Sequence, residues 1–141
     1  MNSHYPILDD SCNKRYKEML RLIKRLGIMD KVVLHDPVPY GELPDFIKAA
    51  DCVVVPSLAE GFGFAAAEAC AMKKPVVASN TTSLPEVVSG KYVLVRPRDP
   101  GAIAIGVDMV KNGREAKTKL KRFELGDNID KYLGVYRRLA G

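Results

Sequence analysis

Three short apolar runs in the middle of the chain constrain its fold more than any other feature. They are rich in β-branched side chains and do not alternate with polar residues: Cys52–Val55, Val76–Ala78 and Tyr92–Val95. Strands that helices cover on both faces have this composition. Helix-like segments separate the runs, and this alternation predicts βαβ units. We therefore expect an α/β fold in which a mostly parallel sheet lies between two helical layers.

The segments around these runs carry helix signals. Apolar residues recur at three- and four-residue steps from Asn13 to Leu26, and Gly27 follows them as a stop. Asp99 is suited to cap a helix that has Pro100 in its first position. The expected helices span residues 13–26, 43–50, 64–72, 100–111, 114–123 and 128–139, with a short helix start at Pro85-Glu86 and a further strand at Val32–His35.

Length and composition favour one folded domain. The chain has 141 residues, of which 47% are hydrophobic and 28% charged, as in ordinary globular proteins. No apolar run approaches the ~20 residues that cross a bilayer, and the N-terminus lacks the pattern of a secretory signal. The 3 cysteines lack C-x-x-C spacing, which argues against a disulfide framework and a zinc site. We expect a single cytoplasmic domain over residues 1–141.

A net charge of +5 raises the question of nucleic acid binding. Residues 1–110 hold 13 basic and 13 acidic side chains, whereas residues 111–141 hold 9 and 4, so the surplus lies in the C-terminal part. These charges are not accompanied by the kind of aromatic interleaving that stacks bases. We expect no nucleic acid partner. A separate hypothesis, that this basic segment contacts RNA or an anionic membrane surface, stays open beside the two functions considered below.

The loop after Cys52–Val55 carries the strongest signal for a ligand site. In sheets of this kind, ligands bind beyond the carboxyl ends of the strands. Gly61 and Gly63 come just before the helix expected at residue 64, where they let the backbone approach a ligand closely. Amide groups at a helix start suit a phosphate. A tight turn between strand and helix explains the same glycines without a ligand, so both interpretations stay open.

One charged residue in an apolar helix strengthens the ligand interpretation. Glu68 is the only charged residue from Gly61 to Met72, so we expect its helix to be buried nearly all round. An unpaired buried carboxylate is costly and must find a partner. Sugar hydroxyls would serve, and Glu60 could face the same crevice on the other side of a bound phosphate. A neighbouring loop or a lysine would satisfy Glu68 equally well.

Residues 60–69 resemble a family signature. Their order is similar to the E-x7-E motif of the retaining GT-B glycosyltransferases of group 1: Glu60-Gly61-Phe62-Gly63-Phe64-Ala65-Ala66-Ala67-Glu68-Ala69. Further blocks between residues 14 and 140 resemble successive parts of that family: Leu43–Ser57, Lys74–Ser79, Leu84–Val88, Val95–Pro100 and Phe123–Leu139. The resemblance implies a Rossmann-like C-terminal domain that binds a nucleotide-diphosphate sugar, while a separate N-terminal domain binds the acceptor.

The resemblance also implies roles for individual residues. Glu60, the catalytic candidate, would bind hydroxyls of the donor sugar, and Glu68 would hold the ribose hydroxyls. Between them, the backbone would meet the diphosphate and the sugar at Gly61, Phe62, Gly63 and Phe64. The loop at Asp36, Pro37 and Val38 would lie against the nucleobase.

The family's chemistry relies on positioning. The acceptor hydroxyl attacks from the face that the diphosphate leaves, and the leaving phosphate takes its proton. Catalysis is then orientation plus electrostatic stabilisation of the diphosphate. No Asp-x-Asp motif is present, so we expect no metal, and no cofactor beyond the nucleotide sugar itself. His35 is expected to be a structural residue rather than a base.

Several features depart from the family pattern. Asp36 replaces a glycine that is common in the nucleobase loop, and Ala65 replaces a frequent proline. The family's first strand, with its Gly-Arg…Lys-Gly segment, has no counterpart here, and neither has the acceptor domain. We expect a donor domain shortened at its N-terminus. Its open sheet edge would be met by a second copy, by a separate acceptor-domain chain or by an altered sheet.

Two hypotheses about function follow. In the first, the chain is the donor-binding part of a retaining glycosyltransferase and is inactive, or nearly so, alone. In the second, it is a non-catalytic module that keeps the fold to bind a nucleotide or a protein. The presence of Glu60, Glu68 and the glycines between them favours the first hypothesis. The absence of the basic side chains of the Gly-Arg…Lys-Gly segment favours the second.

Overall fold

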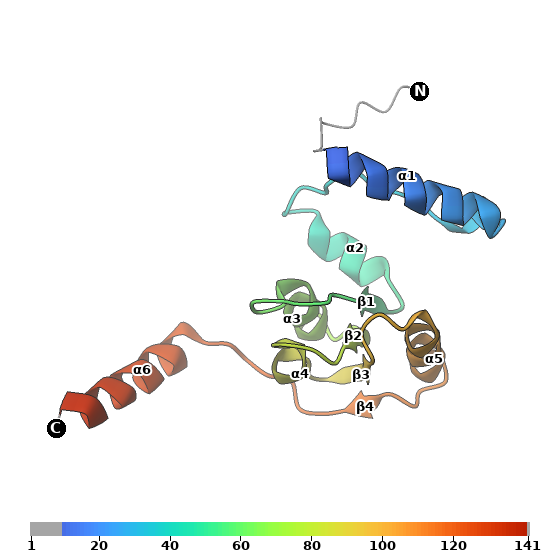
Figure 1. Ribbon diagram of the computed structural model, residues 1–141. Helices are drawn as coiled ribbons and strands as arrows, with labels where there is room; N and C mark the ends of the chain where they lie inside the picture. Colours follow the sequence, from blue (N-terminus) through green and yellow to red (C-terminus); the bar gives the residue numbers. More distant parts are fainter. Residues whose placement is uncertain (1–9, 141) are drawn as a thin grey trace. The chain divides into compact units, whose positions relative to one another are not determined.

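A computed structural model describes residues 10–140 of the chain (Figure 1). The chain divides after Tyr40 into two compact units, and each is described by itself. The first unit contains α1 (Asp10–Arg25) and a short 3-10 helix, η1 (Met29–Lys31). Gly27 follows α1 with a left-handed φ of +64°. The helix predicted before Gly27 is therefore confirmed, although it begins at Asp10 rather than Asn13.

The strand predicted at Val32–His35 is wrong. Residues 32–39 are irregular, and the Val33 side chain is 77% exposed. A strand persists only where a neighbour takes up its backbone hydrogen bonds. Within residues 10–140, no strand pairs with this segment. The two valines made the segment look like a strand, but local composition does not reveal whether a pairing partner is present.

The second unit is built on a four-stranded sheet. Its strands lie in the order of the chain, β1 (Val53–Val55), β2 (Val76–Ser79), β3 (Lys91–Val95) and β4 (Ala116–Lys117). β1, β2 and β3 are parallel, whereas β4 runs antiparallel to β3. The mostly parallel sheet predicted from the three apolar runs is confirmed.

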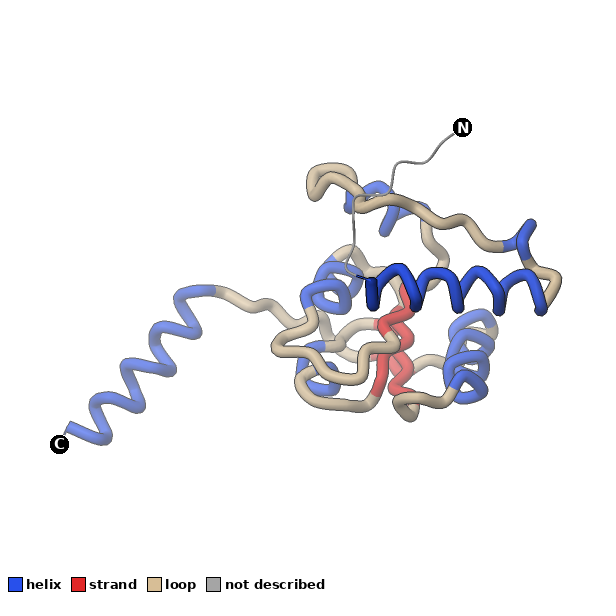
Figure 2. The backbone as a smooth tube through the Cα atoms, turned by 45° about the horizontal axis from the view of Figure 1, so that its top comes forward, coloured by secondary structure: helices blue, strands red, loops and turns tan. Residues whose placement is uncertain are grey.

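Helices cover both faces of this sheet (Figures 1 and 2). On one face, α3 (Phe64–Ala71) and α4 (Leu84–Val87) pack over β1 and β2, and α2 (Leu43–Ala49) adds Ile47 to the same core. On the other face, α5 (Pro100–Lys111) packs over β2 and β3. The strand residues alternate between the two cores, so the three-layer arrangement is confirmed: Val76 and Ala78 face α3, and Val77, Val93 and Val95 face α5.

β1 departs from the prediction of a strand covered on both faces. Val55 is buried in the core beneath α3, but Val54, on the opposite face, is 41% exposed. α5 packs chiefly over β2 and β3 and leaves that face of β1 accessible. The outer edge of β1 has no pairing partner among the residues that the structure describes. β1 is therefore less enclosed than its sequence of valines suggests.

The helix start at Asp99 is confirmed. The Asp99 carboxylate accepts a hydrogen bond of 2.9 Å from the amide of Ala102, which satisfies one free donor of the first turn. α5 ends at Lys111, and Gly113 follows with φ +67°. Asp99 therefore caps α5 as expected, and the left-handed Gly113 follows the end of the helix.

The helix predicted at 114–123 is wrong. Residues 116–123, called the strap below, are not helical: Ala116 and Lys117 form β4 on the edge of β3, and the residues after them contact Gly90 and Ser89. Thr118 exchanges two hydrogen bonds with Gly90, of 2.8 and 3.1 Å, and the amide of Lys121 donates to the Ser89 hydroxyl at 3.1 Å. The strap is dominated by charged side chains and lacks an apolar stripe, whereas the edge of β3 offers backbone partners. Pairing with the sheet therefore prevails over helix propensity.

The last predicted helix is confirmed as α6 (Leu125–Ala140), which begins earlier than residue 128. None of its residues is buried. Within residues 10–140, no helix has both the length and the apolar character needed to cross a membrane.

Candidate functional site

β1 and α3 are joined by residues 56–63, called the glycine loop below. Gly63 has φ +97° and ψ +52°, a left-handed conformation that strains any residue with a side chain. Its carbonyl accepts hydrogen bonds of 3.1 Å from the amides of Ala66 and Ala67 and so begins α3. The prediction that a glycine turn opens a helix at Phe64 is confirmed.

A second loop, residues 80–83 between β2 and α4, lies directly against the glycine loop. Its three hydroxyl side chains hold four backbone groups of the glycine loop. Thr81 donates to the carbonyl of Leu58 at 3.3 Å, and Thr82 accepts from the amide of Glu60 at 3.0 Å. Ser83 donates to the carbonyls of Glu60 and Phe62 at 3.1 and 2.9 Å. Both loops follow the carboxyl ends of adjacent parallel strands. The structure thus brings the loop in which a ligand site was expected together with the loop after β2.

Glu60 is the most firmly held residue of the glycine loop. Its side chain is half-buried, and one carboxylate oxygen accepts a hydrogen bond of 2.6 Å from the Ser57 hydroxyl. That length is typical of a charge-assisted bond. Its amide and its carbonyl are bonded to Thr82 and Ser83. The carboxylate is therefore positioned within the loop before any ligand arrives.

The prediction that α3 is buried nearly all round is wrong. Ala66 and Ala69 are fully buried against the sheet, but Phe64 is 71% exposed. Glu68 is half-buried and has an interaction partner. Only the face of α3 toward the sheet is covered. The run of alanines suggested burial on all sides, but alanine is small enough to occur on an exposed helix face as well.

Glu68 borders a hollow of about 430 Å³ that residues of α3 and of the strap line together. Phe62 and Phe64 of the glycine-loop region line it together with Lys121 of the strap. Glu60 does not line this hollow. The structure therefore brings Glu68 to the same hollow as the two phenylalanines, whereas the two glutamates of the motif do not share it.

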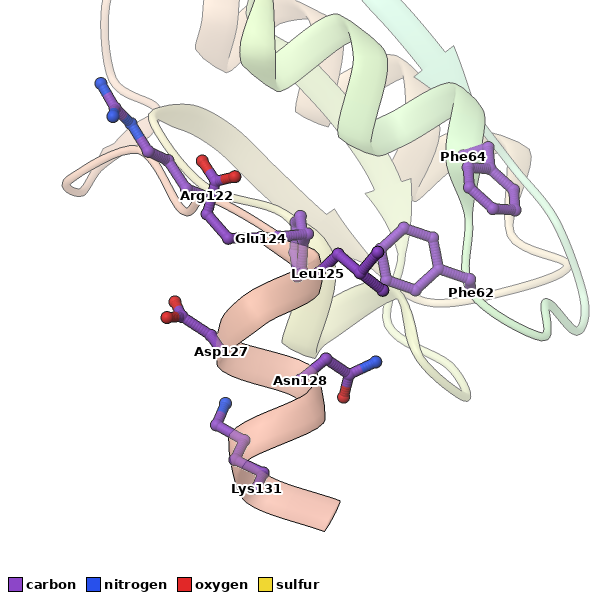
Figure 3. A pocket seen from close by; sticks show the side chains of 9 residues that line it. Phe62, Phe64, Arg122, Glu124, Leu125, Asp127, Asn128 and Lys131 are labelled. Atoms are coloured by element: carbon purple, nitrogen blue, oxygen red, sulfur yellow. The ribbon is translucent and has the colours of Figure 1, made fainter. Parts of the chain in front are cut away.

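Aromatic rings connect the glycine loop to the strap. The Phe62 ring centroid lies 5.0 Å from that of Phe64 and 5.0 Å from that of Phe123, the latter pair at 83°. Such edge-to-face pairs are favourable geometries. A hollow of about 690 Å³ opens beside these rings toward the first turns of α6, where Leu125 and Asn128 line it (Figure 3).

The sequence did not indicate that Phe123 and the residues beside it line the hollow of about 690 Å³. The sequence predicts a helix at 114–123 that includes Phe123, and no local pattern links this residue to Phe62, which lies far away in the sequence. The signal that could have identified Phe123 is its position as a single aromatic residue at the end of a basic run. Only the sheet pairing of the strap places it beside the glycine loop.

The residues expected at a nucleobase belong to the first unit. Asp36 and Pro37 are exposed and Val38 is partly buried, in the irregular segment between η1 and α2. His35 is exposed in the same segment and has an interaction partner. The glycine-loop residues belong to the second unit, where the structure brings them together with one another.

The described cysteines are free thiols. Burial raises the pKa of both Cys52 and Cys70 above the ordinary value of 9.0. Cys70 accepts a hydrogen bond from the amide of Ser89 at 3.4 Å. The side chain of Cys12 lies outside the described part of the chain. Among the residues that the structure describes, no three potential metal ligands lie together.

Comparison with known protein families gives one match that spans most of the chain. A family model described as "Glycosyl transferases group 1" matches residues 13–124. The matched range includes the glycine loop, the loop at 80–83, Glu60, Glu68 and the strap.

Curated relatives carry similar names. A D-inositol 3-phosphate glycosyltransferase of Xylanimonas cellulosilytica is 41% identical over 105 residues, which cover 72% of this chain and 25% of that protein. D-inositol 3-phosphate glycosyltransferase 1 of Catenulispora acidiphila is 36% identical over 130 residues, 85% of this chain and 31% of that protein. The chain thus spans about a quarter to a third of the length of these relatives.

A solved structure shares the fold. A sucrose-phosphate synthase from Thermosynechococcus elongatus superimposes with a TM-score of 0.69 and 28% sequence identity, over 78% of this chain and 28% of that chain. This similarity agrees with the mostly parallel, three-layer arrangement of the second unit and with a Rossmann-like topology.

Proposed function

The chain belongs to the family of group 1 glycosyl transferases, and on that basis we propose that it binds the nucleotide-diphosphate sugar donor of a retaining glycosyltransferase. One observation carries the proposal. The glycine loop, with its left-handed Gly63 and its anchored Glu60, is hydrogen-bonded to the loop after β2 at the carboxyl ends of two parallel strands. That position is the usual ligand site of such sheets.

The proposal assigns roles to the glycine loop and to the first turns of α3. Glu60 binds hydroxyls of the donor sugar, and Glu68 binds those of the ribose. The backbone between the carboxylates binds the diphosphate and the sugar at Gly61, Phe62, Gly63 and Phe64. Support for the first role comes from the Ser57 bond of 2.6 Å, which holds the Glu60 carboxylate ready to accept from hydroxyls. The assignment of Asp36, Pro37 and Val38 to the nucleobase rests on the family resemblance.

Catalysis in this proposal is largely positioning. The acceptor hydroxyl attacks the sugar from the face that the diphosphate leaves, and the leaving phosphate accepts its proton. Backbone amides stabilise the charge that develops on the diphosphate. We propose that residues 1–141 serve as one donor-binding domain and do not transfer sugar alone, since they span about a quarter to a third of the relatives.

The open edge of β1 supports a proposal about assembly. An unpaired strand edge exposes backbone groups that pair readily with another strand. We propose that a second copy or a separate acceptor-domain chain supplies that strand. Light scattering separates these possibilities, because a chain of 15.5 kDa that stays monomeric when pure excludes the second copy.

Donor binding is tested by thermal unfolding with a panel of nucleotide sugars. UDP-, GDP- and ADP-sugars at millimolar concentration should raise the melting temperature for at least one donor, with a shift that grows with concentration. Inorganic phosphate is the control for unspecific binding to the basic strap. If no donor stabilises the protein beyond phosphate, the non-catalytic, protein-binding alternative replaces the proposal.

A further inference from the structure

The Ser83 hydroxyl holds two carbonyls of the glycine loop at once. Its oxygen lies 3.1 Å from the carbonyl oxygen of Glu60 and 2.9 Å from that of Phe62. A hydroxyl carries a single proton, so the two carbonyls share one donor and must both point toward it. Ser83 therefore fixes the orientation of two peptide units that are separated by one residue.

These two peptide units contain the amides of Gly61 and Gly63. In a trans peptide the carbonyl and the amide of the next residue point in opposite directions, and none of the described peptide bonds is cis. With the carbonyls of Glu60 and Phe62 directed at Ser83, the amides of both glycines are directed away from it. Within residues 10–140, neither of these amides donates a hydrogen bond.

We propose that Ser83 is a positioning residue that aims the amides of Gly61 and Gly63 at the phosphates of the nucleotide-sugar donor. The proposal rests on the proposed function, because it adds to that site the side chain that orients the donors of its backbone. Amides oriented before binding stabilise an anion without reorganisation, and this makes them more effective than amides of a mobile loop.

Ser83 is itself held in place by the fold. It precedes α4, and its carbonyl accepts hydrogen bonds of 3.0 and 3.1 Å from the amides of Glu86 and Val87. The next residue, Leu84, is fully buried. The hydroxyl thus projects from a rigid point of the core onto a loop that is otherwise rich in glycine.

The experiment compares three variants of the full chain: Ser83→Ala, Ser83→Thr and Thr81→Ala. Thr81 is the matched control because it ties the same two loops, but through the carbonyl of Leu58, which precedes the amide of Ala59. Affinities for pyrophosphate and for the donor that stabilises the wild type are measured by calorimetry. Amide signals of Gly61 and Gly63 are followed by nuclear magnetic resonance during both titrations.

Ser83→Ala should weaken pyrophosphate and donor binding about tenfold, the effect of roughly one lost charge-assisted contact. Ser83→Thr, which keeps the hydroxyl, should restore the affinity. Thr81→Ala should bind pyrophosphate and the donor like the wild type, even if its melting temperature falls as much as that of Ser83→Ala. The amide signals of both glycines should shift on titration in the wild type and respond less in Ser83→Ala.

Two results overturn the proposal and are distinguishable. If the wild type binds a donor and Ser83→Ala binds it equally well, or Thr81→Ala loses as much affinity, the role of Ser83 is refuted while the proposed function stands. If the wild type binds neither pyrophosphate nor any donor, the proposed function fails and the role of Ser83 fails with it.

Discussion

Leu84 fills the space beside Gly63 so closely that a Cβ on the glycine would lie 2.8 Å from Leu84 Cδ2. Leu84 is fully buried and cannot move aside without disturbing the core beneath α3. Gly63 also has φ +97°, which a side chain tolerates poorly. Two independent constraints, one of packing and one of backbone conformation, therefore require glycine at this position.

Gly63→Ala is expected to lower the free energy of unfolding by about 1–3 kcal/mol and to weaken donor binding. Urea denaturation measures the first effect and calorimetry the second. Gly61→Ala is the control, since a Cβ there meets nothing within 4 Å. Its stability should stay within about 0.5 kcal/mol of the wild type. Equal losses in the two variants would contradict this account of Gly63.

Gly106 allows α5 to approach the sheet. A Cβ on it would lie 2.9 Å from the Cγ1 atoms of both Val77 and Val95. Gly106→Ala should therefore destabilise the protein by about 1–3 kcal/mol through overpacking, as measured by urea denaturation. Gly134→Ala on α6 has open space around it and should not destabilise the protein. A neutral Gly106→Ala would show that α5 shifts away from the sheet at little cost.

The cap of α5 makes a separate contribution to stability. Asp99→Ala removes the acceptor of the Ala102 amide and should cost about 1 kcal/mol, whereas Asp99→Asn keeps an oxygen there and should lose less. Thermal and urea unfolding measure both. If the two variants lose stability equally, the charge rather than the hydrogen bond is responsible.

The two glutamates of the motif should differ in what they bind. Glu68→Ala is expected to weaken binding of the free nucleotide and of the donor alike, by about tenfold, because both carry ribose. Glu60→Ala should weaken binding of the nucleotide sugar only. Calorimetry with a nucleoside diphosphate and with the matching nucleotide sugar measures each effect. Equal effects of both variants on both ligands would refute the separate roles.

The buried thiols predict how stability depends on pH. Burial raises the pKa of Cys70 and of Cys52 above 9.0, so in the unfolded chain these thiols lose their protons first as pH rises. Stability should consequently be complete below that value and fall as pH passes the raised pKa. Urea unfolding at about pH 8 and about pH 10 should show a smaller loss in a Cys52→Ala/Cys70→Ala variant than in the wild type.

The elements that local signals specify were predicted well. The valines of β1 and β2 identified strands, and Asp99 with Pro100 located the start of α5, because a strand's composition and a helix cap are properties of neighbouring residues. The errors occurred where the structure of a segment depends on whether a distant strand is available to pair with it. Val32–His35 resembles a strand but has no neighbour in the described chain, and residues 114–123 found a sheet edge instead of forming a helix.

In the candidate site, too, residues with a local signal were identified and residues placed by distant contacts were not. Gly63 and Glu60 could be identified from the sequence, since a glycine turn before a helix is a local pattern. Ser83 and Phe123 could not, because their contacts with the glycine loop join segments 21 or more residues apart. The exposure of Phe64 was also unforeseen, since its helix contains so many alanines.

The order of the sheet affects how the protein folds. β1, β2, β3 and β4 are neighbours in space in the same sequence in which they are synthesised. Each new strand pairs with the strand made just before it, so only the connection between consecutive strands has to close at each step. The sheet can therefore grow one strand at a time as the chain leaves the ribosome, because no strand has to wait for a partner that is synthesised later than its neighbour.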